Sequence, residues 1–86
     1  MTSVRVREVL FRVYPQDHTH RGHRHVHGLI GSVAVIVDLM GDGSVRVAQR
    51  NDAVQHATRS EVRKVLSEAA EGFDRLAEAW EEMHRG

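Results

Sequence analysis

The first part of the chain alternates between apolar and polar positions with a period of two. Every second residue of VLFRVY (9–14) falls on one side of an extended chain, so this segment predicts a β-strand that ends before Pro15. The two valines of VRV (4–6) are out of phase with that strand. We therefore expect one strand over about residues 4–14 with an irregular start, and a separate N-terminal arm is the alternative.

Further strands are predicted on either side of glycine-containing turns. A short apolar piece around Val26 predicts a strand at about residues 24–30, and a run rich in β-branched residues predicts another at about 33–39, with the turn between Gly28 and Ser32. GDG (41–43) is a tight-turn signature, after which VRV predicts another strand over about residues 44–49. Together these segments predict an antiparallel sheet of three to four strands.

The period changes to that of a helix in the last third of the chain. Thr58 and Glu61 have the spacing of a capping box, and apolar residues then recur at helical spacing. Because this stripe keeps its phase through Gly72, we expect one long amphipathic helix over about residues 59–84, and a break at Gly72 is the alternative. The sequence thus predicts an α+β fold with the helix packed on one face of the sheet.

Such a helix would be longer than the sheet beneath it. About 25 residues rising 1.5 Å each span roughly 38 Å, whereas a six-residue strand reaches about 20 Å. The overhanging part of the apolar stripe must then be covered by another chain or folded back at Gly72. We therefore expect an interface with a second copy of the chain, or with a small cognate protein, at Phe73, Leu76, Trp80 and Met83.

Length, charge and composition narrow the class of protein. A chain of 86 residues is expected to form a single domain over residues 1–86. It contains no cysteine, which excludes disulfides and thiolate metal sites. Twelve basic residues balance twelve acidic ones, which argues against a general nucleic-acid binder. The sequence has no apolar run long enough to cross a membrane, and we expect a cytoplasmic protein.

The candidate chemistry lies in HTHRGHRHVH (18–27), which holds five of the chain's seven histidines. Residues two apart on a strand point to the same face, so the last histidines of this segment can project together. Neutral imidazoles with a nearby carboxylate form a usual ligand set for metals such as zinc or nickel. A metal site of this kind would use His18, His23, His25, His27 and Asp17.

Other interpretations of the histidine segment stay open. Its histidines can be solvated loop residues without a specific role. They can also act as general acid and base in RNA cleavage, with Arg21 and Arg24 binding the anionic phosphate. Few aromatic residues are left to stack on bases, which weakens a nucleic-acid role. Asp38 either orients a histidine or only begins the turn at Gly41.

Four short motifs also occur in a suggestive order. They are VYPQDH (13–18), HRHV (23–26), AVIVDL (34–39) and LAEAW (76–80). Together they resemble the DUF4160 family of small bacterial proteins over about residues 9–80. The chain departs from the family pattern in having THRG where members usually have two prolines.

The resemblance implies a small α+β domain and a partner in a toxin–antitoxin-like pair. Of the candidate metal ligands it carries over Asp17, His18, His23 and His25. We therefore expect a protein-interaction module that forms a homodimer or binds a small cognate protein. A histidine-rich protein that binds zinc or nickel and a small ribonuclease-like enzyme are the alternatives.

Overall fold

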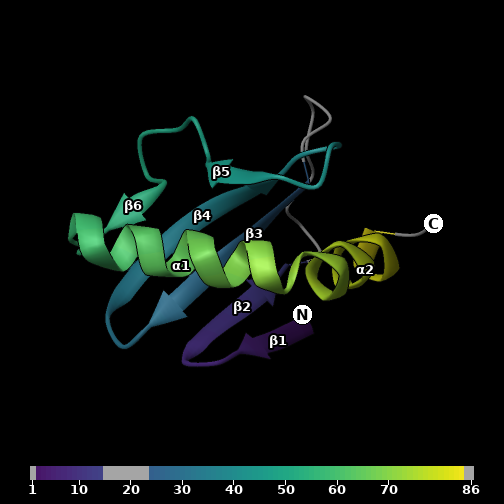
Figure 1. The fold of residues 1–86 in the computed structure, drawn as a ribbon, viewed down its shortest axis with the longest axis horizontal. Helices are drawn as coiled ribbons and strands as arrows, with labels where there is room; N and C mark the ends of the chain where they lie inside the picture. The colour runs from purple at the N-terminus through teal and green to yellow at the C-terminus, as the bar shows by residue number, and fades with distance from the viewer. Residues whose placement is uncertain (1, 15–23, 85–86) are drawn as a thin grey trace.

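The computed structural model describes residues 2–14 and 24–84, and within them it confirms the α+β prediction (Figure 1). The described strands form one antiparallel sheet of six strands, with neighbours in the order β1-β2-β3-β4-β5 and with β6 also paired to β4. The elements are β1 (Thr2–Val6), β2 (Val9–Val13), β3 (Arg24–Ile30), β4 (Val33–Leu39), β5 (Val45–Val47), β6 (Val54–Gln55), α1 (Arg59–Glu71) and α2 (Phe73–His84).

The prediction of one strand over residues 4–14 is wrong, because this segment forms the hairpin of β1 and β2. Val6 pairs with Val9, so only Arg7 and Glu8 form the turn. Arg7 has a φ of 55°, in the left-handed region that the two-residue turns of β-hairpins require at their first position. The change of phase in the sequence therefore marks a reversal of the chain and not a bulge within one strand.

The edge of the sheet next to β4 also differs from the prediction. The predicted strand over residues 44–49 is shorter, and the chain leaves the sheet after β5 and returns as β6. The excursion between β5 and β6, residues 48–53, is hydrogen-bonded to Ile36 of β4. The N–H of Ile36 donates to the carbonyl of Ala53 at 2.7 Å, and the carbonyl of Ile36 accepts from the N–H of Ala48 at 2.9 Å. The sheet has six strands where three to four were predicted, because the predicted first strand forms both β1 and β2 and because both β5 and β6 pair with the edge of β4.

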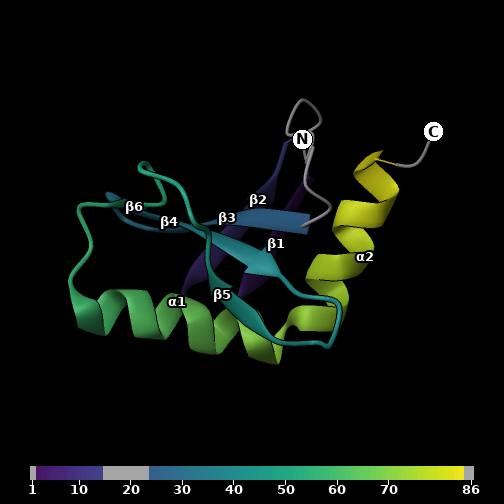
Figure 2. The ribbon, with the colours of Figure 1, turned by 90° about the horizontal axis from the view of Figure 1, so that it is seen from above.

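The prediction of one continuous helix is wrong as well. The capping box at Thr58 and Glu61 is present, but α1 ends before Gly72 and α2 begins after it. A Cβ atom at position 72 would lie 2.7 Å from Cγ2 of Val6, so glycine is what lets the bend approach β1. As a result, α1 crosses one face of the sheet and α2 turns along its end (Figure 2).

The bend lets the chain cover its own apolar stripe, which is the folded-back alternative. Leu76 is fully buried and Trp80 is buried, and both belong to the core between the helices and the sheet. Phe73 and Met83 are half-buried and pack against the same core. These four residues were predicted to form an interface, and the structure places them inside one chain. The largest fully buried side chains of this core are Phe11, Leu39, Leu76, Val9, Val13, Val26, Val35, Val37 and Val65.

The hydrogen bonds of Asp42, in the turn between β4 and β5, predict how its carboxyl group titrates. The Ser44 hydroxyl and then the Ser44 backbone N–H donate to Oδ1 of Asp42, at 2.5 and 2.9 Å, and together they hold the Asp42 pKa below its ordinary value of 3.8. A carboxyl whose pKa is lowered by folding stabilises the fold at neutral pH, and this contribution is lost as the pH falls through the lowered pKa.

We expect Ser44→Ala to raise the Asp42 pKa toward its ordinary value, because the larger of the two causes is removed. Carboxyl ¹³C chemical shifts followed against pH measure this directly. Ser67→Ala, a change at an exposed serine of α1, is the control and should leave the Asp42 titration unchanged. An Asp42 titration that is the same in both variants would contradict this account of the turn.

Candidate functional site

Five ring-bearing side chains form a continuous cluster at one end of the sheet. The Tyr14 ring meets the His27 ring edge-on, with centroids 4.8 Å apart, and the His27 and His25 centroids are 5.8 Å apart. His25 in turn lies 5.0 Å from Trp80, and Trp80 stacks on His84 at 3.7 Å with an interplanar angle of 23°. We call Tyr14, His25, His27, Trp80 and His84 the ring cluster.

Simple spacings in two elements position the ring cluster. His25 and His27 are two residues apart on β3 and therefore project to the same face of the sheet. Trp80 and His84 are four residues apart on α2, so they lie one above the other on the helix surface. Nδ1 of His84 lies 3.0 Å from the carbonyl oxygen of Trp80, which fixes the imidazole over the indole.

A buried carboxylate lies beside the ring cluster. Asp38 is opposite His25 in the register of β3 and β4, and it is only 7% exposed. Its Oδ2 accepts from Nε of Arg46, which lies opposite it on β5, at 3.3 Å. Asp38 therefore does not begin the turn to β5, because it lies within β4 and is paired across the sheet.

One face of the sheet is left without a helix. Neither of the described helices covers it, because both pack against the opposite face and one end. A half-buried apolar row made of Leu10, Leu29 and Ala34 crosses this face, in register with Arg5 at the edge. The adjacent row contains Arg12 opposite His27. We call Arg5, Leu10, Arg12, His27, Leu29 and Ala34 the open sheet face.

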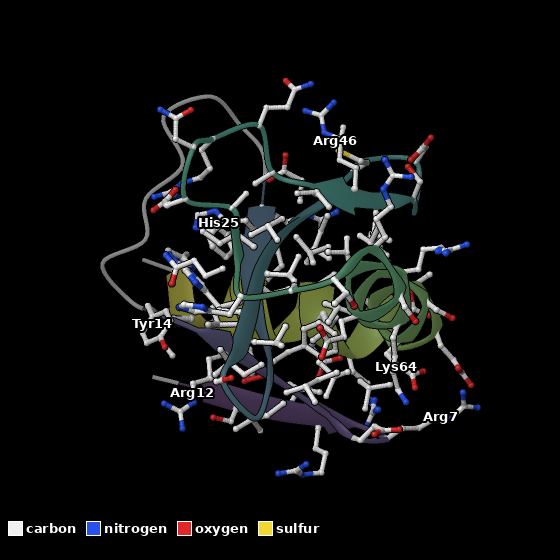
Figure 3. All side chains as sticks on the ribbon, turned by 90° about the vertical axis from the view of Figure 1, so that its left-hand side faces the viewer. Arg7, Arg12, Tyr14, His25, Arg46 and Lys64 are labelled. Atoms are coloured by element: carbon white, nitrogen blue, oxygen red, sulfur yellow. The ribbon has the colours of Figure 1, made fainter. Side chains whose placement is uncertain are left out.

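The positive charge of the two arginines on the open sheet face is not balanced by acidic residues of that face. Arg5 and Arg12 make no ion pair with any carboxylate of the described residues, and Nε of Arg12 is buried there without a hydrogen-bond partner. In Figure 3, Arg12, Tyr14 and His25 lie on the side of the sheet away from α1, whereas Arg7 and Lys64 lie on the side of α1. The uncovered side therefore carries positive charge next to apolar surface.

The excursion between β5 and β6 brings one acidic residue close to this face. The pKa of Asp52 is lowered, chiefly because Nε of Arg50 donates to its carboxylate at 2.6 Å, with a smaller contribution from the charge of His27. Asp52 is thus already neutralised by Arg50. It does not cancel the positive charge of Arg5 and Arg12.

The predicted site residues are brought together only in part. His25 and His27 lie side by side as expected. Arg24, predicted to bind an anion, instead lies 5.6 Å above the Phe73 ring and pairs with Glu81 at 3.5 Å. Among the described residues, no three His, Asp or Glu side chains are grouped closely enough to hold a metal ion. The other predicted site residues lie outside the described ranges: Asp17, His18, Arg21 and His23.

Sequence reasoning missed Arg12, Tyr14 and His84 as members of this region. The i, i+4 spacing of Trp80 and His84 was a visible signal that the two rings would stack. The motifs VYPQDH, HRHV, AVIVDL and LAEAW each contribute one residue here, namely Tyr14, His25, Asp38 and Trp80. These motifs are far apart in the sequence, and the fold brings them to one end of the sheet.

No family model, curated protein or solved structure matches the chain. In the part of the chain that the structure describes, neither helix is long and apolar enough to cross a bilayer.

Proposed function

We propose that this protein is a small interaction module that binds an acidic segment of a partner protein across the open sheet face. The observation that carries the proposal is the combination, on the face that neither described helix covers, of an apolar row with two arginines that pair with no carboxylate of residues 2–14 and 24–84. Apolar contact supplies the favourable free energy of binding, and charge selects the partner. A segment that alternates apolar residues with Asp or Glu has the matching chemistry.

This interaction surface differs from the one predicted from the sequence. The apolar stripe of α2 is already buried in the core, so it does not need a partner to cover it. Neither described helix covers the open sheet face, and the segment between β5 and β6 covers only its part at Ile36. The small cognate protein expected from the resemblance, as in a toxin–antitoxin-like pair, fits this proposal, and a second copy of the chain is the other partner to be tested.

Charge reversal on the open sheet face tests the proposal. The wild type, the variant Arg5→Glu/Arg12→Glu and the control Arg59→Glu/Arg63→Glu, which has the same change of charge on α1, are each expressed in the cells of origin and crosslinked. We expect the wild type and the control to recover the same protein, and the open-face variant to recover at least about tenfold less of it. Equal recovery by all three, or the absence of any specific partner, would overturn the proposal.

A second candidate function is metal binding through the histidine segment. The observation that favours it is the position of His25 and His27 on one face of β3, with ring centroids 5.8 Å apart. Imidazole pairs of this kind suit zinc or nickel. The remaining ligands would have to come from the predicted residues outside the described ranges.

Calorimetric titration of the untagged protein with zinc and nickel chloride tests the second candidate. Stoichiometric binding that is lost in His25→Ala/His27→Ala and kept in His56→Asn is expected. Asparagine is chosen for the control because residue 56 has a φ of 61°, which asparagine tolerates. Weak binding that is the same in both variants would assign metal binding to solvated histidines.

A further inference from the structure

A second surface lies at the far end of the molecule from the ring cluster, where the chain passes from β6 into α1 (Figure 1). A groove of about 460 Å³ is present there. Val54 of its lining is the one large apolar side chain among the described residues that is exposed, at 40%. Ala57 and Val62 are half-buried against the core, so the apolar floor is held in place by the fold. The groove is lined by Val54, Ala57, Arg59, Val62 and Arg63.

Among the residues that the structure describes, the charged side chains that line this groove are two arginines. Arg59 and Arg63 are four residues apart on α1 and therefore lie on the same side of the helix. Both are exposed, and neither makes an ion pair within residues 2–14 and 24–84. Their neighbour Lys64, by contrast, pairs with Glu8. The groove thus combines an apolar floor with two guanidinium groups that are not neutralised.

We propose that this groove binds a small amphiphilic carboxylate, a molecule with an aliphatic or aromatic body and one anionic end. The body covers Val54, Ala57 and Val62, and the carboxylate accepts hydrogen bonds from Arg59 and Arg63. The volume lies within the range of small-ligand sites, and guanidinium groups match the geometry of a carboxylate. This site is separate from the open sheet face and does not depend on the function proposed for it.

A titration of the ¹⁵N-labelled protein followed by NMR tests this inference. The probe is decanoate below its micellar concentration, and decanol, which has the same chain without the charge, is the control ligand. We expect saturable amide shift changes confined to residues 54–63. Charge-assisted hydrogen bonds are expected to supply much of the affinity. Decanol, which lacks the charge, should therefore bind at least about tenfold more weakly than decanoate.

Two matched variants complete the experiment. Arg59→Gln/Arg63→Gln should weaken decanoate binding by about tenfold or more and leave decanol binding unchanged. Arg5→Gln/Arg12→Gln removes the same number of charges from the open sheet face and should leave decanoate binding unchanged. The inference is overturned if decanol binds as well as decanoate, if both variants lose affinity equally, or if the shifts lie outside residues 54–63.

Discussion

Replacement of Trp80 by alanine is expected to lower the free energy of unfolding by about 3–5 kcal/mol. The indole is buried in the main core and is also the point at which α2 contacts His25 of β3. Removal of the ring leaves a cavity between the helix and the end of the sheet. A domain of this length has a total stability of about 4–13 kcal/mol, so the variant should be close to unfolding.

Urea unfolding followed by far-ultraviolet circular dichroism measures this loss without relying on the tryptophan. His84→Ala is the matched control, because it removes the ring on the outer side of Trp80 at the half-buried end of α2. We expect the control to lose less than about 1 kcal/mol. A loss of that small size in Trp80→Ala would show that α2 is not anchored to the sheet through its indole.

The variant Gly28→Ala is expected to lose about 1–3 kcal/mol through overpacking. Gly28 lies on β3 beneath α1, and a Cβ atom there would lie 2.6 Å from Cγ1 of Val65 and 3.0 Å from Cε1 of Phe11. Both neighbours are fully buried in the core. Glycine is thus required at this position because the helix approaches the strand closely.

A double-mutant cycle separates this steric cause from the loss of backbone freedom. Val65→Ala removes the closer of the two neighbours, so the double variant should be more stable than the sum of the single effects predicts. Gly41→Ala is the control, because a Cβ atom at position 41 would have no neighbour within 4 Å. Its stability should change by no more than about 0.5 kcal/mol, and strict additivity of the Gly28 and Val65 effects would contradict the steric explanation.

The sequence predicted the parts of the fold that depend on local signals. The strand β4 follows from a run of β-branched residues, β3 follows from the apolar piece around Val26 before a glycine-containing turn, and the start of α1 follows from the capping box at Thr58. The turn at Arg7 gave no such signal, because its left-handed conformation is usually taken by glycine or asparagine. The strand β6 has only two residues and exists through its pairing with β4. The turn left only the change of phase in the sequence, and β6 left no local pattern.

The candidate site was predictable only to the extent that its residues are neighbours in sequence. The side-by-side placement of His25 and His27 follows from the period of a strand. The contact of His25 with Trp80 depends on the bend at Gly72, and that bend is set by the close approach to Val6. The alternation of the strand already placed Arg12 on the side opposite Phe11. That this side would lack a helix depends on the global arrangement of layers.

The packing of α2 against β1 has a consequence for synthesis of the chain. The hairpin of β1 and β2 is synthesised well before Leu76 and Trp80, which lie in the same buried core as its apolar side. During translation that side has no cover from its final partner until α2 has left the ribosome. The nascent hairpin therefore exposes an apolar side to the solvent until α2 has been synthesised, and the complete core can form only after that point.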